Sequence, residues 1–252
     1  MFYGWIIVTT CFLVTMITYG AGFSFGVFLT SLRQTFGSTT AAISGAYSLQ
    51  VFLYTGFAVL AGWGADKYGA KITTMTGGIF LSSGLLLTSQ ASTVWQLYVT
   101  YGLIGIGMST AYSPLMTTVS RWFVKRRGLA IGISSTGLGV GPLIMAPLAS
   151  YLISVADWRL SYLVMGGAGA LIVPLAWSLK RSPQDAVSHN ASIAPPATKT
   201  GGNTPEASEF SLVEAIRTQA FWLISLTFLM VGMGLQMVLA HTVAYSGLKG
   251  VP

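Results

Sequence analysis

The chain has 252 residues, of which 53% are hydrophobic and only 8% are Asp, Glu, Lys or Arg. Soluble domains carry about 25% charged residues, so this composition, with a mean hydropathy of +0.68, predicts an integral membrane protein and excludes an ordinary soluble domain. The 13 basic and 6 acidic residues give a net charge of +7, but the basic residues stand in short turns between apolar segments, which excludes a nucleic-acid-binding face.

Apolar segments long enough to cross the roughly 30 Å hydrocarbon core of a bilayer follow one another along the chain. We expect seven spans, none with a charged residue in its interior, at 4–29, 41–64, 72–90, 94–120, 128–154, 159–179 and 220–246. The first segment is too long for a signal peptide and lacks a basic start, so we expect it to stay in the protein as a membrane anchor. This pattern predicts an all-α membrane protein.

The basic residues are distributed unevenly between the two sides of the predicted membrane. The first, third and fifth turns hold only Arg33 and Arg159. The second, fourth and sixth turns hold ten basic residues, namely Lys67, Lys71, Arg121, Lys125, Arg126, Arg127, Lys180, Arg181, Lys199 and Arg217. Because Lys and Arg are retained on the cytoplasmic side during insertion, this bias predicts a multi-pass protein of the cell membrane with its N-terminus in the cytoplasm.

In the first span, Tyr19, Phe23 and Phe25 alternate with glycines, which let a second helix or a ligand come close. Packing is the simpler interpretation of the two Phe rings, whereas the Tyr19 hydroxyl is a candidate for binding a ligand. The turn after the second span contains Asp66 at the end of a helix, where the helix dipole disfavours a carboxylate unless a cation compensates it. We therefore expect Asp66 to have a partner, and the simplest arrangement is a solvated turn held by Lys67 and Lys71.

The fourth span carries Tyr101, Gly105, Met108 and Tyr112 at spacings that place them on one helical face. Pro114 follows and predicts a bend, because proline leaves a backbone carbonyl without its helical donor. Tyr112, at the end of this stripe, is a second candidate for binding a ligand, although a tyrosine in this position can also bond only to a neighbouring carbonyl.

The fifth span follows the basic cluster at 121–127 and is unusually rich in glycine. Small residues let membrane helices approach closely. They form two stripes at helical spacing, one of Ala130, Ser134, Gly137 and Gly141 and the other of Gly128, Gly132, Ser135 and Gly139. We therefore expect this helix to have close neighbours on both faces and to be buried in a bundle.

A segment rich in Pro, Ser, Thr, Ala and Gly divides the chain. We expect three parts: a six-helix bundle at 1–180, a disordered cytoplasmic linker at 181–210, and a short amphipathic helix with the seventh span at 211–252. Ser211 and Glu214 fit a capping box at the start of that short helix. Within the seventh span, Gln236 and His241 are polar groups that a ligand could contact, or that could link helices or cap one.

Two motifs resemble a known family. The turn with Gly62, Asp66, Gly69 and Lys71 resembles the turn between helices two and three of the major facilitator superfamily. The stretch from Trp122 through Lys125-Arg126-Arg127-Gly128 to Gly137 and Gly141-Pro142 resembles the start of helix five in its monocarboxylate porters. The glycine pair that usually follows the proline is replaced here by Met145-Ala146. The His241 to Val251 tail is similar to the family's end of helix seven.

The resemblance implies a fold of one six-helix half plus a seventh transmembrane helix, a truncated carrier whose missing C-terminal half would be a structural partner. It implies transport of a small organic anion, such as a monocarboxylate, by rocking two halves about a central site, coupled to a proton or a counter-anion. The implied gating residues are Gly62, Asp66, Gly69, Lys71, Arg126, Arg127, Gly137, Gly141 and Pro142. Asp66 would lock the cytoplasmic gate.

Because the spans contain no Lys or Arg, the main cation for an anion at mid-membrane must come from elsewhere. These spans offer Tyr19, Tyr112, Gln236 and His241 as hydrogen-bond donors, and His241 could also carry a proton. A seven-helix receptor or photoreceptor is the alternative, but the charge bias and the absence of a lysine from the last span oppose it. His189 and His241 are the only histidines, so we expect no metal, no cofactor and no enzymatic site.

Overall fold

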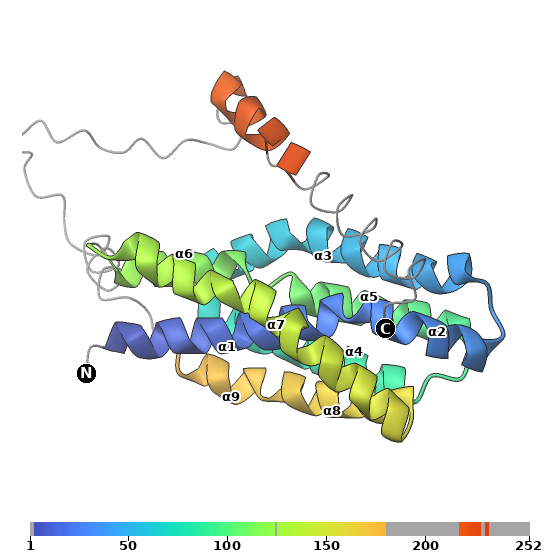
Figure 1. The fold of residues 1–252 in the computed structure, drawn as a ribbon. Helices are drawn as coiled ribbons and strands as arrows, with labels where there is room; N and C mark the ends of the chain where they lie inside the picture. Colours follow the sequence, from blue (N-terminus) through green and yellow to red (C-terminus); the bar gives the residue numbers. More distant parts are fainter. Residues whose placement is uncertain (1–2, 124, 180–216, 228–229, 232–252) are drawn as a thin grey trace, which may run out of the picture. The chain divides into compact units, whose positions relative to one another are not determined.

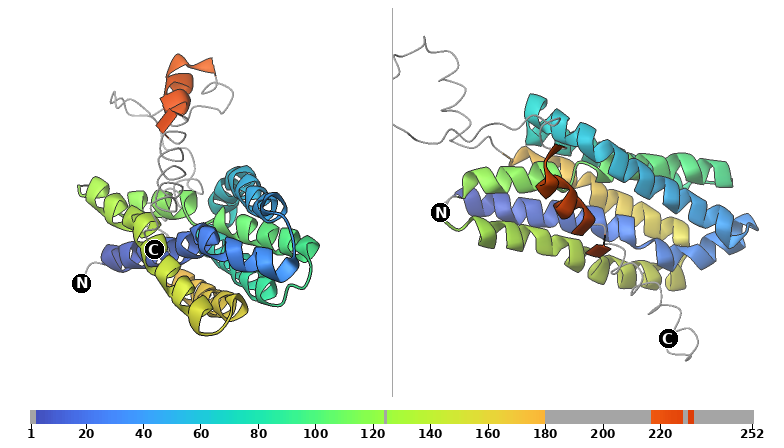
Figure 2. Two further views of the ribbon diagram at one scale, coloured as in Figure 1. Left: turned by 45° about the vertical axis from the view of Figure 1, so that its right-hand side comes forward. Right: turned by 90° about the horizontal axis from the view of Figure 1, so that it is seen from above.

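The structure, a computed structural model, describes residues 3–123, 125–179, 217–227 and 230–231. The chain divides into two units, residues 1–195 and 196–252. Every regular element among the described residues is helical (Figure 1). In the second unit the helical residues include 219–227. The labelled helices all belong to the first unit, where they run side by side (Figure 2).

Six of the predicted spans correspond to helices of the first unit, three of them to interrupted pairs. The helices are α1 (Tyr3–Phe23), α2 (Phe25–Phe36), α3 (Thr40–Tyr68), α4 (Ala70–Ser89), α5 (Val94–Met108), α6 (Ser113–Trp122), α7 (Arg127–Val155), α8 (Trp158–Ala170) and α9 (Ile172–Trp177). Among the described residues, five stretches are long and apolar enough to cross a membrane: Tyr3–Phe36, Thr40–Tyr68, Ala70–Ser89, Arg127–Val155 and Trp158–Trp177. The predicted span at 94–120 is divided between α5 and α6, and neither is long enough alone.

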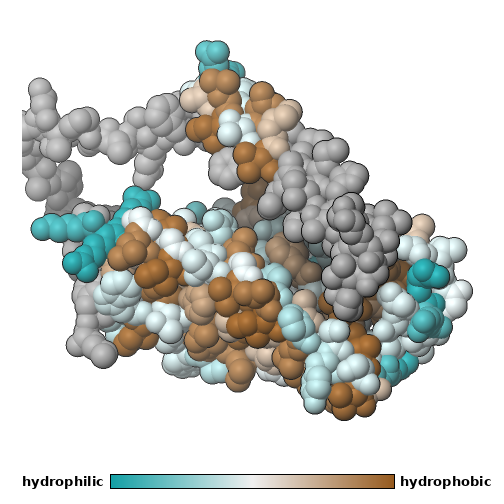
Figure 3. Space-filling view, viewed as in Figure 1, coloured by the Kyte–Doolittle hydropathy of each residue, from teal (hydrophilic) through white to brown (hydrophobic). Residues whose placement is uncertain are grey.

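The turns gather at two ends of the bundle, as an up-and-down arrangement requires. At one end the Tyr3 hydroxyl donates to the Ser178 carbonyl over 2.8 Å, and the Tyr3 and Trp122 rings lie 5.6 Å apart. At the other end the Trp158 indole donates to Thr35 Oγ1 over 2.9 Å. Polar side chains gather at both ends with a hydrophobic band between them (Figure 3), which is the distribution that a bilayer-spanning bundle needs.

The first end, which we call the basic end, contains the α3–α4 turn and the α6–α7 connection. Lys71 in the first turn of α4 lies over the Trp177 ring of α9 at 3.8 Å. Lys125, Arg126 and Arg127 are exposed beside the start of α7. The second and fourth turns therefore share one end of the bundle, as the charge pattern predicted, whereas most of the sixth turn lies outside the described residues.

Local signals explain where the helices begin and end. Thr39 caps α3, and Thr93 forms a capping box with Gln96 at the start of α5. The α3–α4 turn is a single residue, Gly69, whose φ of +91° is a conformation that favours glycine. We expected the span to end at residue 64, but α3 continues to Tyr68. As a result, residues 62–66 are helical, and the turn is tighter than the motif predicted.

The small-residue stripes of α7 do not behave alike. The first packs on α1: a Cβ added at Gly137 would come within 2.6 Å of the Phe12 carbonyl oxygen, and one at Gly141 within 2.8 Å of the Gly20 amide nitrogen. Around the second stripe, at Gly128, Gly132 and Gly139, such a Cβ would meet no atom of the described chain within 4 Å. The expectation of close neighbours on both faces is therefore wrong for this part of the chain.

The physical reason is that a stripe of small residues packs closely only where a neighbouring helix lies against it. Among the described helices, only α1 approaches α7 this closely along its length, through the first stripe. The hydroxyl of Thr15 donates to the Ser134 carbonyl across this contact over 3.0 Å. Only 17% of the most apolar stretch of α7 is buried, and the same share of α3, against 67% for the stretch that begins with α1. α1 is therefore central, while α3 and α7 are largely uncovered within the described chain.

Candidate functional site

Tyr19, predicted as a ligand-binding residue, lies inside the bundle. Its side chain is buried, and its hydroxyl shares a hydrogen bond of 3.2 Å with the hydroxyl of Tyr54 on α3. The Tyr112 hydroxyl is close enough to interact with it electrostatically. The structure therefore brings together two of the predicted residues, Tyr19 and Tyr112, and adds Tyr54, which the sequence reasoning missed.

Tyr112 is not part of the continuous stripe that its spacing predicted. α5 ends at Met108, and Tyr112 stands before the first residue of α6, with its side chain 41% exposed, whereas Tyr101 and Met108 are buried. Pro114 in the first turn of α6 has no N–H to continue the helix across 109–112. The face predicted to be one stripe is thus split, with Tyr101 and Met108 buried and Tyr112 partly exposed.

Gln50 is a buried amide that sequence reasoning also missed. It lies in the middle of α3, is 2% exposed, and donates through Nε2 to the Gly22 carbonyl and to Met108 Sδ, both at 3.2 Å. A lone amide within the apolar stretch 41–64 was the available signal, because a buried amide in a membrane needs partners.

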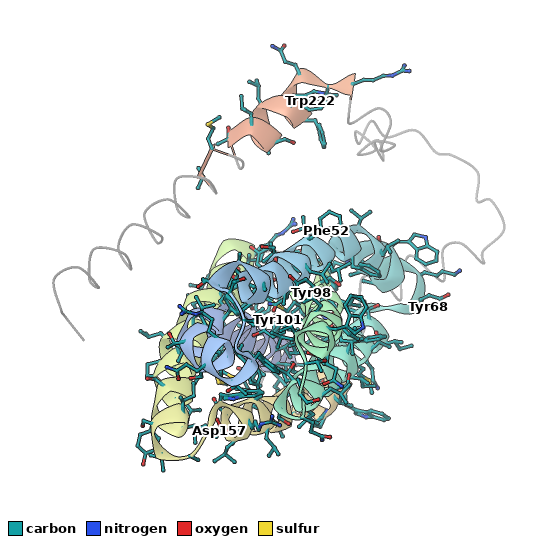
Figure 4. All side chains as sticks on the ribbon, turned by 90° about the vertical axis from the view of Figure 1, so that its right-hand side faces the viewer. Phe52, Tyr68, Tyr98, Tyr101, Asp157 and Trp222 are labelled. Atoms are coloured by element: carbon teal, nitrogen blue, oxygen red, sulfur yellow. The ribbon has the colours of Figure 1, made fainter. Side chains whose placement is uncertain are left out.

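An aromatic cluster occupies the interior next to Gln50. The hydroxyls of Tyr101 on α5 and Tyr162 on α8 share a hydrogen bond, and the Phe25 ring is stacked on the Tyr47 ring at 4.6 Å. Figure 4 shows Tyr101 among the helices of the bundle and Phe52 on the outer side of α3. A narrow gap between the helices, without room for a water molecule, is lined by residues from α1–α5 and α8, including Ala21, Gly22, Phe25, Gln50, Tyr101 and Tyr162. It offers hydroxyl and amide groups and no charge.

Asp66 has the cationic partner that its place at a helix end requires, but the partner is neither Lys67 nor Lys71. Its carboxylate Oδ1 lies 3.7 Å from Nη2 of Arg121, in the last turn of α6, and the side chains are 74% and 49% exposed, respectively. Lys67 instead lies over the rings of Trp63 and Tyr68, at 4.8 and 5.2 Å. The ion pair joins the end of α3 to the end of α6.

The other predicted gating residues are divided between the basic end and the α1–α7 contact. Gly62 precedes Asp66 on α3, Gly69 forms the turn after it, and Lys71 follows on α4. Arg126 precedes α7 and Arg127 begins it, both exposed. Pro142 lies inside α7 directly after Gly141. Arg159, at the opposite end, donates to the carbonyls of Ser89 and Ala91 and so ties the start of α8 to the end of α4.

Several predictions fall outside the described residues. Gln236, His241 and the linker at 181–210 belong to this group, as does most of the seventh span. Within the described residues, no group of three His, Cys, Asp or Glu side chains is placed to hold a metal ion. The geometry of the site therefore rests on Tyr19, Tyr54 and Tyr112 in the spans, and on the ion pair at the basic end.

Apolar helices with buried hydroxyl and amide groups, charged turns and a hydrophobic surface band define a multi-pass α-helical membrane protein. Within that class, the chain belongs to the Major Facilitator Superfamily, because the sequence profile of that family matches residues 11–252. The resemblance predicted from the two motifs is thereby confirmed, as is the fold.

Similar proteins point to one branch of the superfamily. The chain is 32% identical over 181 residues to human monocarboxylate transporter 12, which covers 69% of this chain and 35% of the relative. It is 31% identical over 197 residues to monocarboxylate transporter 12 of Xenopus laevis, covering 72% and 43%. It is 32% identical over 181 residues to human monocarboxylate transporter 1, covering 69% and 36%. The matched region is thus less than half the length of these relatives.

A solved structure supports the fold independently. The chain superposes on the inward-open conformation of the xylose transporter XylE from E. coli with a TM-score of 0.64 and 12% sequence identity, covering 75% of this chain and 50% of the other. The relatives are named as transporters, in agreement with the expectation of a protein that is not an enzyme. The receptor alternative finds no support among them.

Proposed function

We propose that the chain is part of a secondary transporter that moves small organic anions, with monocarboxylates as the substrate class, across the cell membrane by alternating access. The observation that carries the proposal is the similarity of about 70% of the chain to monocarboxylate transporters at 31–32% identity. In the proposed orientation the basic end faces the cytoplasm together with the N-terminus, in accordance with the retention of Lys and Arg on that side.

The proposed substrate contacts in these spans are hydrogen-bond donors. Tyr112 is half-exposed, and within the described chain its hydroxyl has no hydrogen-bond partner, so it can donate to a carboxylate. Tyr19 lies beside it, bonded to Tyr54. We propose Gln236 and His241 as further contacts, with His241 as a carrier of a coupled proton.

We propose the ion pair between Asp66 and Arg121 as part of the cytoplasmic gate. It joins α3 to α6 at the basic end, and both side chains are exposed enough to exchange partners when the helices move. The proposed gate also includes the other residues of the two motifs at this end, namely Gly62, Gly69, Lys71, Arg126 and Arg127. At the contact of α7 with α1, Gly137 and Gly141 allow the close approach, and Pro142 follows directly.

We propose that further transmembrane helices complete the carrier as its second half. Two observations support this: the similarity spans less than half of the relatives' length, and only 17% of the most apolar stretches of α3 and α7 is buried. The second half would supply the positive charge that a carboxylate needs in the membrane, because the interiors of the described spans contain no Lys or Arg. A proton or a counter-anion would be the coupled species.

The test uses a carrier that contains this chain followed by the residues encoded downstream of it. Tyr112→Phe removes one hydroxyl, and we expect it to raise the half-saturation concentration for lactate or pyruvate roughly tenfold, the usual effect of losing one hydrogen bond to a charged group. His241→Ala should abolish the proton dependence of uptake. Tyr151→Phe, at an exposed position on α7, is the matched control.

Two results of the same transport assay would contradict the proposal. Unchanged affinity and pH profile in both variants, at normal surface expression, would remove Tyr112 and His241 from the site. Absence of saturable carboxylate uptake by the unmodified carrier would contradict the substrate class.

A further inference from the structure

Two of the three interrupted membrane segments, the first and the fourth, are linked near their interruptions. The first is interrupted at Ser24, between α1 and α2, where the Ser24 hydroxyl donates to the Gly20 carbonyl over 2.6 Å. The fourth is interrupted at 109–112, between α5 and α6. Breaks of this kind are tolerated inside a membrane only where other groups of the protein satisfy the backbone and side chains that they disturb.

Gln50 contacts both interrupted segments at once. One nitrogen, Nε2, donates to the Gly22 carbonyl, two residues before the first break, and to the sulfur of Met108, the last residue before the second break, each over 3.2 Å. Ser24, Met108 and Gln50 are all buried, so water does not compete for these bonds.

The packing around Gln50 leaves little freedom. A Cβ added at Gly22 would collide with the Met108 side chain, and one added at Gly105 would collide with the backbone of Gln50 itself. α3 and α5 therefore meet at backbone distance at this point, and the side chains of Met108 and Gln50 fill the space between them and α1. If the angle at one break changes, one hydrogen-bond partner of the Gln50 amide moves. Because the same amide is bonded beside the other break, that break is disturbed as well.

We propose that Gln50 is a positioning residue that couples the two breaks, so that α1–α2 and α5–α6 bend together. The coupling fixes Tyr19, one turn before the first break, relative to Tyr112, inside the second. The inference rests on the proposed function only for the role of these two tyrosines. The mechanical link itself can be tested in the chain without transport.

The experiment is hydrogen–deuterium exchange of the whole chain in lipid nanodiscs, read by mass spectrometry. Gln50→Met keeps a long side chain but removes the donor. We expect exchange to rise roughly tenfold in peptides covering both 20–28 and 106–116, with no change in α4 and α8. Met108→Leu keeps the bond to Gly22 and removes only the sulfur, so only the 106–116 peptides should exchange faster. Gln34→Met, exposed on α2, is the matched control and should change neither.

Three results would overturn the proposal. A response of only one break to Gln50→Met would show that the amide serves a single helix. If exchange rose in all peptides, including those of α4 and α8, Gln50 would be a general packing residue, because a purely structural role predicts that result. Unchanged exchange at 106–116 in Met108→Leu would remove the contact with the second break. None of these results depends on whether the carrier transports a carboxylate.

Discussion

At the scale of single residues, the ion pair of Asp66 with Arg121 shows how exposure limits what a charge contributes. The charged atoms are 3.7 Å apart, at the long end of an ion pair, and water reaches both side chains. Such pairs contribute about 0–1 kcal/mol to the free energy of unfolding. The pair is therefore suited to forming and breaking during a conformational change rather than to holding the bundle together.

Asp66→Asn should therefore lower the free energy of unfolding of this chain by less than about 1 kcal/mol. Asp157→Asn is the useful contrast, because Asp157 caps α8 by accepting the Trp158 N–H over 2.7 Å and also approaches Arg159. We expect a loss of about 1 kcal/mol there, the usual value of a helix cap. Thermal unfolding in detergent measures both.

A cost for Asp66→Asn equal to or above that of Asp157→Asn would show that Asp66 has a structural role. In the complete carrier the same Asp66 variant should impair transport while this stability remains.

At the scale of elements, the contact of α1 with α7 depends on glycine on both helices. A Cβ added at Gly137 or Gly141 would collide with backbone atoms of α1, which cannot move aside as a flexible side chain can. A Cβ at Gly20 would likewise fall 2.9 Å from the Gly141 carbonyl oxygen. Without a hydrophobic driving force between helices in lipid, this close packing is a main source of their attraction.

Gly141→Ala should destabilise the bundle by about 1–3 kcal/mol, the usual cost of overpacking. Gly132→Ala places the same methyl group on the same helix with no atom of the described chain within 4 Å. It should leave stability unchanged or raise it by up to about 1 kcal/mol, because alanine favours a helix more than glycine does. Tryptophan fluorescence during heating compares the two, and equal effects would contradict the packing on α1.

At the scale of the whole molecule, the distribution of charge orients the bundle. Lys67, Lys71 and the basic residues at 121–127 lie at one end, while Arg33 and Arg159 lie toward the other. The exposed surfaces of α3 and α7 between the two ends are apolar. Orientation and assembly are the two properties of the molecule that experiments on the intact chain can test.

For orientation, single cysteines should be introduced at Gln34 and at Lys125 in a Cys11→Ser background. Both positions are exposed, at opposite ends of the bundle, whereas Cys11 is buried. A membrane-impermeant maleimide added to intact cells should label the cysteine at 34, and the one at 125 only after permeabilisation, because the basic end is expected inside. Labelling of both from the same side would refute the proposed topology.

For assembly, the chain reconstituted alone should show no saturable uptake of lactate, pyruvate or oxalate. The reason is that alternating access needs two halves about a central site, and the described spans supply donors but no cation. Counterflow of labelled substrate into proteoliposomes is the measurement, with protein-free liposomes as the control. Saturable, protein-dependent counterflow would mean that the chain is sufficient by itself.

Most of the architecture could be predicted from the sequence, because lipid imposes strict local requirements. For the described residues, the length of each apolar segment, the charges between segments and the glycine at 69 predicted the helices, their up-and-down order and the end at which the turns lie. The need of Asp66 for a cation followed from its place at a helix end. These features depend on residues close together in the chain, so the sequence shows them directly.

The tertiary structure alone decided which groups meet. Arg121, and not a neighbouring lysine, pairs with Asp66; Gln50 joins two interrupted helices; and only one of the two glycine stripes of α7 packs on a helix of the described chain. Hydropathy could not distinguish these outcomes, because a lipid tail is as apolar as the side chains of a neighbouring helix. Which apolar or small face meets protein is settled only when the helices are arranged in space.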